Sequence, residues 1–298
     1  MAKLPRSRRR LRAVPPVLLA LLSALTLTVA MAAASASSAP VLPTPKSFVS
    51  QLDLQCFRSS PYTPPSVVIS TRHLNPVLAG LPEERVTLGN RDQVCVPVAK
   101  NGVAPSPDAL DFIRFVDLAC YRITGITVNR QLNLAHLNPV LSGVPASNVV
   151  MTTPQQLCVP VVKNGNVPPP EILRLVQYID LKCYAISPQT AMNRQLSLRH
   201  LNPVLAGVPG TAANVTLNRQ LCVPVQKNAQ PIPADVLAIV RWIDLVKYDL
   251  SATAGVPISL GLRHINPLLG GLPPEQATLT APSQLAVPVA KNNAFPPG

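Results

Sequence analysis

The sequence of 298 residues has few aromatic and few acidic side chains, and it lacks the short motifs that mark common enzymes. It contains no G-x-S-x-G, no H-E-x-x-H and no glycine-rich phosphate-binding loop. Its 13 acidic residues are scattered and mostly single apart from Glu83-Glu84, so a pair of catalytic carboxylates would have to come from distant parts of the chain. These absences predict a non-enzymatic protein.

The six cysteines and four histidines are not clustered as metal and redox sites require. No C-x-x-C motif occurs and no second ligand type follows a histidine at a fixed short distance, which excludes zinc-finger and thioredoxin-like sites. We therefore expect no metal and no cofactor. Each histidine is expected to end an apolar face and to hydrogen-bond into the following turn, and four equivalent ligands or bases are the alternative. The histidines are His73, His136, His200 and His264.

The first 36 residues have the pattern of an export signal. Basic residues come first, an apolar run spans 14–29, and small residues end in Ala34-Ser35-Ala36. The run is shorter than the roughly 20 residues that a bilayer needs. We predict a signal peptide over residues 1–36 and no stable transmembrane segment in the mature chain, with a retained anchor as the alternative. Ser7-Arg8-Arg9 leaves the twin-arginine and Sec export routes both open.

The positive charge of the chain lies largely in this signal. The formal net charge is +13, and removing the six basic residues of the signal lowers it to +7. A nucleic-acid partner is therefore not expected. The remaining excess still favours anionic surfaces through weak, salt-sensitive attraction, so an anionic wall or extracellular polymer is the expected partner.

One stretch of about 64 residues occurs four times after the signal. Each copy begins near a D-L-x-C-Y motif or a variant of it, and ends near L-C-V-P-V-x-K or a variant. Proline-rich segments separate the copies, and we expect them to be extended spacers. The predicted repeat units span 41–104, 105–167, 168–231 and 232–298.

The cysteines indicate one disulfide within each of the first three units. The fourth unit lacks both cysteines, since Lys247 stands in place of the first and Ala286 in place of the second. Joint loss is what a bond within each unit predicts, because a single remaining cysteine would be a free thiol. An even number of cysteines in an exported chain also favours disulfides. The expected bonds are Cys56–Cys95, Cys120–Cys158 and Cys183–Cys222.

The residue patterns predict a mainly β fold with short helices, arranged as four small α+β units. Residues 180–186 and 196–200 alternate like strands, and 202–207 fit a one-turn helix with Asn as N-cap, Pro at the first position and Gly at the end. Residues 172–179 fit two helical turns or a buried strand. A unit of this size is marginally stable, and a bridge closing a loop of about 40 residues would supply roughly 4 kcal/mol. We expect the fourth unit, which has no bridge, to dock on the third through Trp242.

The two cysteine motifs resemble those of a secreted prokaryotic repeat domain of unknown function, which has C-Y near its start and L-C-x-P-x-x-K near its end. The resemblance covers residues 41–298. The middle of each unit, H-L-N-P-V-L in three copies, departs from the acidic D-Q-F segment of that family. No activity is assigned to such domains, so the resemblance implies an extracellular repeat protein without naming its ligand.

Charged residues flank the two cysteine positions of each unit. If the two strands pair antiparallel, the Asp of the first motif and the Lys of the second become neighbours, and a surface ion pair is one interpretation. The other interpretation is a row of cationic, ligand-facing sites. Its members would be Lys100, Lys163, Lys227 and Lys291, joined by Arg72, Arg199 and Arg263.

An aromatic residue follows the first cysteine position in every unit. We expect this ring to pack against the neighbouring disulfide, and stacking on a sugar is the alternative. The four residues are Phe57, Tyr121, Tyr184 and Tyr248.

Together these features predict an exported, non-enzymatic repeat protein, secreted or at the cell surface, that acts as a cell-envelope or extracellular interaction module. Four weak, equivalent sites would bind a polymer with high avidity. The alternative is a structural spacer without a ligand, and a remote alternative is a hydrolase with a site between units. The sequence leaves the ligand and the oligomeric state open.

Overall fold

The computed structural model describes residues 41–253, 255 and 257–298, so the predicted signal peptide over 1–36 lies outside the described residues. The described residues form one compact unit. The fold is mainly β with short helices, as the sequence predicts. In the described part of the chain no helix is long and apolar enough to cross a membrane.

Eight strands pair into a closed cylinder, each antiparallel to both of its neighbours. Around the cylinder the order is β1 (Leu54–Tyr62), β4 (Arg91–Lys100), β5 (Leu118–Arg122), β7 (Ser147–Lys163), β8 (Leu181–Ser187), β10 (Thr211–Lys227), β11 (Leu245–Ala252) and β13 (Glu275–Lys291), which pairs again with β1. Closure leaves no edge strand in the cylinder, so its backbone donors and acceptors find partners within the chain.

Five further strands lie outside the cylinder and join distant parts of the chain. They are β2 (Val68–His73), β3 (Glu84–Thr87), β6 (Arg130–His136), β9 (Ala191–His200) and β12 (Ile258–His264). The end of β10 pairs with β2, and the end of β4 pairs with β9. In the same way the end of β13 pairs with β6, and the end of β7 pairs with β12. Four of these strands, β2, β6, β9 and β12, therefore connect a stretch of sequence to the stretch two repeats away, and β3 pairs with β2 of its own repeat.

These pairings correct the expectation of four separate small domains. Strands from 41–104 and 168–231 complete one another, and so do strands from 105–167 and 232–298. The proline-rich segments are not spacers either, because they lead directly into helices. Proline lacks a backbone donor and has a fixed φ, which suits the first turn of a helix.

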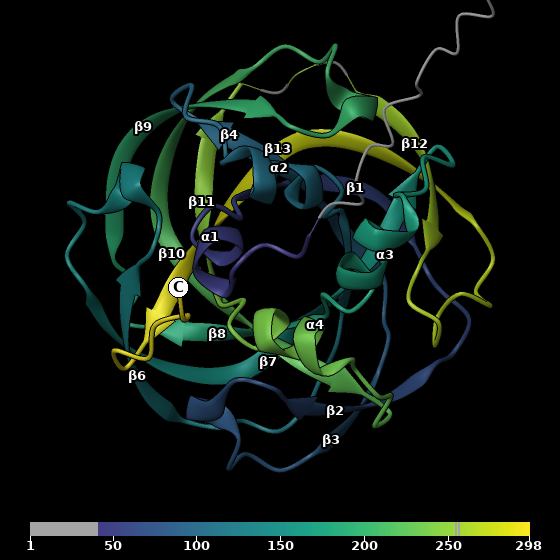
Figure 1. The fold of residues 1–298 in the computed structure, drawn as a ribbon, viewed down its shortest axis with the longest axis horizontal. Coiled ribbons are helices and arrows are strands. Elements are labelled where there is room, and N and C mark those ends of the chain that lie inside the picture. The colour runs from purple at the N-terminus through teal and green to yellow at the C-terminus, as the bar shows by residue number, and fades with distance from the viewer. Residues whose placement is uncertain (1–40, 254, 256) are drawn as a thin grey trace, which may run out of the picture. The chain divides into compact units, whose positions relative to one another are not determined.

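The described residues form four short α-helices. These helices lie around the centre of the view in Figure 1, with the strands arranged about them. They are α1 (Pro45–Val49), α2 (Pro107–Ile113), α3 (Pro170–Val176) and α4 (Ala234–Val240). Each of them comes just before a cylinder strand, namely β1, β5, β8 or β11, so all four lie at the end where those strands begin. Residues 172–179, for which the sequence allowed either two helical turns or a buried strand, are mainly helical and lie largely in α3.

The one-turn helix predicted at residues 202–207 is confirmed, and the first and second repeats have equivalent helices. They are 3-10 helices at Pro76–Leu78, Pro139–Leu141 and Pro203–Leu205. In each of them the preceding Asn side chain accepts a hydrogen bond from the backbone N–H two residues later. This contact satisfies one of the donors that a helix start leaves free.

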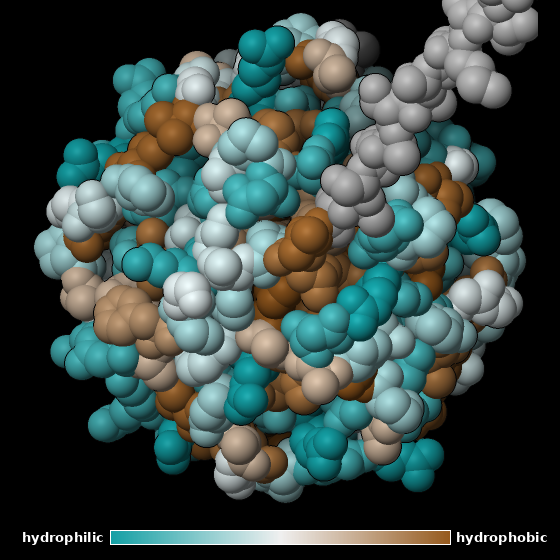
Figure 2. Space-filling view, in the orientation of Figure 1, coloured by the Kyte–Doolittle hydropathy of each residue, from teal (hydrophilic) through white to brown (hydrophobic). Residues whose placement is uncertain are grey.

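The helices and the inner faces of the strands enclose one apolar core. It contains Phe48, Phe112 and the three disulfides, and two further clusters lie between the cylinder and the outer strands. Side chains alternate along each cylinder strand, so Cys120 faces the interior while Tyr121 faces outward. In Figure 2 apolar side chains gather near the middle of the face that carries the helices, with hydrophilic side chains around them.

The closed pairing predicts that no repeat can be removed without unfolding the rest. A chain of residues 41–231 would lack β11, β12 and β13, so β1 and β10 would each lose a neighbour in the cylinder. We expect it to lose the cooperative urea transition that residues 41–298 show by circular dichroism. A cooperative transition with a similar midpoint in residues 41–231 would mean that the repeats fold independently.

Candidate functional site

Four buried aspartates each pair with a buried lysine. Nζ of Lys100 lies 2.5 Å from Oδ1 of Asp53, and Nζ of Lys227 lies 2.5 Å from Oδ1 of Asp180. The pairs Asp117–Lys163 and Asp244–Lys291 are equivalent. The four lysines expose only 1–2 % of their surface. The strands pair as the sequence predicts, but the ion pairs lie in the interior and not on the surface.

Each aspartate also accepts a hydrogen bond from an asparagine of another repeat. Nδ2 of Asn138 donates to Asp53 at 2.7 Å, and Nδ2 of Asn202 donates to Asp117 at 2.8 Å. The remaining contacts are Asn266 to Asp180 at 3.3 Å and Asn75 to Asp244 at 2.7 Å. The fourth contact leads back to the first repeat, so these bonds connect all four repeats in a ring.

This burial overturns the expected row of ligand-facing lysines. Lys100, Lys163, Lys227 and Lys291 cannot present charge to a polymer, because each is enclosed with its aspartate. Burial raises the pKa of Asp53 to about 6 and lowers the pKa of Lys100, and the opposite charge of each partner offsets part of both shifts. The arginines expected beside them do face solvent. They are Arg72, Arg199 and Arg263.

Three disulfides lie inside the cylinder, between the cysteines that the sequence pairs. They join Cys56 to Cys95, Cys120 to Cys158, and Cys183 to Cys222, and no cysteine is free. Neighbouring bridges touch, since Sγ of Cys95 lies 3.7 Å from Sγ of Cys120. Bridges of this kind indicate an oxidising compartment outside the cytoplasm.

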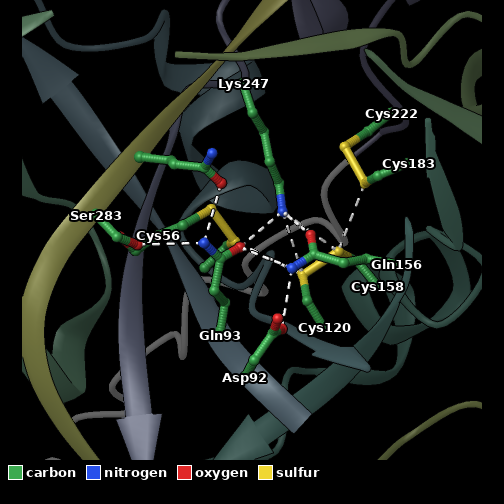
Figure 3. Close-up of a disulfide and its surroundings, with 12 residues drawn as sticks. Cys56, Asp92, Gln93, Cys120, Gln156, Cys158, Cys183, Cys222, Lys247 and Ser283 are labelled. Carbon is green, nitrogen blue, oxygen red and sulfur yellow. Dashed lines mark hydrogen bonds between the residues drawn. A yellow bond between two sulfur atoms is a disulfide. The ribbon is translucent and has the colours of Figure 1, made fainter. Parts of the chain in front are cut away.

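Lys247 occupies the place of the missing fourth bridge. It is paired with Ala286 across β11 and β13, as the cysteines are paired in the other three strand pairs. Its amine donates to Oε1 of Gln156 at 2.7 Å and to Oε1 of Gln93 at 3.0 Å (Figure 3). The same amine lies 3.7 Å from Sγ of Cys120.

The fourth repeat, which has no cysteine, is not stabilised by docking on the third repeat through Trp242, although the sequence predicts this. Its strands pair with β10 and with β1, and the amine of Lys247 reaches across the interior. Trp242 is partly buried against the core that all four helices share, so it does not dock on one repeat alone. Burial lowers the pKa of Lys247 to about 7, and the charge of Asp92 opposes that shift.

Three of the four histidines hydrogen-bond to tyrosines of other repeats and not to the following turn. Nε2 of His73 lies 3.0 Å from the hydroxyl of Tyr184, and the same contact joins His264 to Tyr121 at 3.0 Å. His136 and Tyr248 are 3.1 Å apart. These tyrosines point outward, so their rings lie under the outer strands and not beside the disulfides. Burial lowers the pKa of every histidine to about 4.

The fourth histidine has no such partner. His200 faces Phe57, which has no hydroxyl, with 5.7 Å between the ring centroids. A cavity of about 550 Å³ adjoins both side chains. One repeat therefore differs from the other three at this position.

The cylinder end opposite the helices carries two polar cavities that the sequence did not indicate. One, of about 590 Å³, is lined by Asp92, Arg122, Gln156 and Gln220 among others. The other, of about 370 Å³, is lined by Arg58, Asn90, Asp92 and Arg122 among others. The two cavities share Asp92 and Arg122, whose side chains form an exposed ion pair at 3.1 Å. The one sequence feature that could have pointed to this end is a Gln two residues before the second cysteine position of each repeat. These are Gln93, Gln156, Gln220 and Gln284.

Comparison with known proteins adds no assignment to this geometry. No protein-family model matches the chain, and neither a curated protein nor a solved structure shows a significant match. Among the described residues, no group of three His, Cys, Asp or Glu side chains is placed to hold a metal ion.

Breaking one of the buried ion pairs should be costly. In Lys163→Met the carboxylate of Asp117 would stay buried without its counter-charge, so we expect the free energy of unfolding to fall by roughly 3–5 kcal/mol. The matched control is Arg174→Met, which breaks the exposed pair with Asp235 and should lower the free energy of unfolding far less, because solvent screens exposed charges. Urea unfolding measures both, and equal small losses would contradict the structural role of the buried pairs.

The depressed pKa of Lys247 predicts a pH dependence of stability. Between pH 7 and the usual lysine pKa, the unfolded chain binds a proton at this side chain that the folded chain does not. Stability of the wild-type protein should therefore rise with pH across this window, relative to Lys247→Met, by at most about 1.4 kcal/mol per pH unit. Urea unfolding of both proteins from pH 7 to 9 measures the difference. Parallel pH profiles would show that the amine titrates normally.

Proposed function

We propose that this protein is an exported, non-enzymatic interaction module of the cell envelope or extracellular space, which binds a polar or anionic polymer at the cylinder end opposite the helices. The observation that carries the proposal is the pair of adjoining polar cavities at that end, which share Asp92 and Arg122. Export is supported by the signal-like pattern of residues 1–36 and by the three disulfides.

The chemistry of these cavities suits a polymer with hydroxyl and acidic groups. Amides of Gln156 and Gln220 offer both donors and acceptors, and the guanidinium groups of Arg58 and Arg122 pair with carboxylates or phosphates. Arg122 is 71 % exposed at its side chain and Asp92 is 26 % exposed. A ligand can therefore displace this ion pair at little cost.

The tandem arrangement has a structural role in this proposal. Four copies of one unit, duplicated in the sequence, close on one another into the cylinder, and the recurring Asp–Lys pairs support that origin. The copies do not supply four equal ligand sites, because the cavities at the polymer-binding end have different lining residues. Avidity of four equivalent sites is therefore not part of the mechanism.

The binding test compares two double variants that lose the same charge at different places. Residues 41–298, produced in an oxidising host, are passed over immobilised polygalacturonate and its methyl-esterified, uncharged form. We expect salt-sensitive binding to the acidic polymer, reduced tenfold or more in Arg58→Ala with Arg122→Ala. The control, Arg199→Ala with Arg263→Ala, removes exposed charges of the outer strands β9 and β12 and should change binding less than twofold.

Three outcomes would contradict this proposal. Equal losses in both double variants would mean that only overall charge matters. Absence of binding at low salt to any wall polymer would favour the alternative of a structural spacer without a ligand. Turnover of a polymer during the same experiment would support the third interpretation, a hydrolase with a site between repeats.

A further inference from the structure

The cavity beside His200 lies where one contact that recurs in the other repeats is missing. In three places a tyrosine hydroxyl lies 3.0–3.1 Å from the Nε2 atom of a histidine. At the fourth place Phe57 stands where the tyrosines stand, and no described residue hydrogen-bonds to Nε2 of His200. His200 is only 7 % exposed, so its imidazole is a buried polar group beside a cavity.

The cavity beside His200 also lacks a charged residue that two other repeats have at the equivalent position. Eleven residues after the histidine, the first and fourth repeats have Glu84 and Glu275. Glu84 binds Lys182, and Glu275 binds Arg91 and the hydroxyl of Tyr121. The third repeat has Thr211 at this position, and Thr211 lines the cavity. None of the described residues that line the cavity is charged.

A third observation is an unsatisfied amide on the same side of β1 as Phe57. Gln55 precedes Phe57 by two residues, so both side chains leave the strand on one side. Gln55 is fully buried, and neither atom of its side-chain amide has a hydrogen-bond partner. In the third repeat the equivalent residue is Lys182, which bonds to Glu84. Buried polar groups without partners are rare in proteins. Gln55 does not line the cavity, so its free amide shows only that contacts made in the other repeats are also missing on this side of β1.

We propose that this cavity binds a small neutral molecule of the phenol class, whose hydroxyl hydrogen-bonds to Nε2 of His200. The hydroxyl takes the place that a tyrosine hydroxyl takes beside the other three histidines, and the apolar ring lies against Phe57, Ile258 and Leu279. A volume of about 550 Å³ is within the range of small-molecule sites. This site is separate from the polar cavities and does not depend on polymer binding.

The absence of charge in the lining selects a neutral ligand. The imidazole of His200 is uncharged at neutral pH, because burial and the nearby charge of Lys163 lower its pKa to about 4. A carboxylate or an ammonium group would lose its hydration in the cavity without gaining a counter-charge. A phenol retains its one hydrogen bond and buries an apolar ring.

The test uses 4-methylphenol and toluene, which differ by one hydroxyl, in calorimetric titrations of residues 41–298. Losing one hydrogen bond should make toluene bind about tenfold more weakly than 4-methylphenol. Phe57→Tyr places a protein hydroxyl beside His200, as in the other repeats, and should abolish binding of 4-methylphenol. The matched control Tyr248→Phe removes the equivalent hydroxyl beside His136 and should leave binding at the His200 cavity unchanged.

A second measurement does not depend on a variant. The ring nitrogen resonances of His200 in the wild-type protein should shift on addition of 4-methylphenol and remain unchanged with toluene. Absence of binding, equal affinity for the two compounds, or binding that survives Phe57→Tyr would each overturn the proposal. Arg58→Ala with Arg122→Ala should bind 4-methylphenol normally, so failure of the polymer-binding proposal leaves this result intact.

Discussion

The structure depends on four buried aspartates, each of which holds two distant parts of the chain. One oxygen of each carboxylate pairs with the lysine at the end of its own repeat, and the other accepts from an asparagine of a different repeat. A buried charge is tolerable only when it is paired and hydrogen-bonded, so each site requires strands from separate repeats to be in place together. The ring of these contacts explains why the described residues form one compact unit although the sequence is repetitive.

Equivalent residues of the four repeats form the cylinder. Unusual interior side chains occur where one repeat differs from the other three. Disulfides occupy three of four equivalent interior positions, and Lys247 occupies the fourth. Tyrosines occupy three of four positions beside the histidines, and Phe57 occupies the fourth. Each exception leaves an unusual group in the interior: an amine with a lowered pKa in one case, and an imidazole beside a cavity in the other.

The sequence was sufficient for local structure and for pairing within a repeat. Asn followed by Pro predicted the one-turn helices, and the joint replacement by Lys247 and Ala286 predicted which cysteines bond. It was insufficient for contacts between repeats, because periodicity says which side of a strand is apolar but not which strand covers it. The lysines therefore fitted either a surface ion pair or a surface row, although each is enclosed with its aspartate. The hydroxyl partners of His73, His136 and His264 lie in other repeats, so no short sequence interval could indicate them.

Native-state hydrogen exchange tests most directly whether the four repeats form one interlocked structure. Four amides report on it, because each donates to the backbone carbonyl of a buried aspartate at 2.9–3.0 Å. They belong to Val98, Val161, Val225 and Val289. If the repeats are interlocked, all four amides should exchange only through global unfolding, with the same free energy and the same dependence on denaturant. Four separate free energies, or early exchange at Val289 in the repeat without a disulfide, would contradict it.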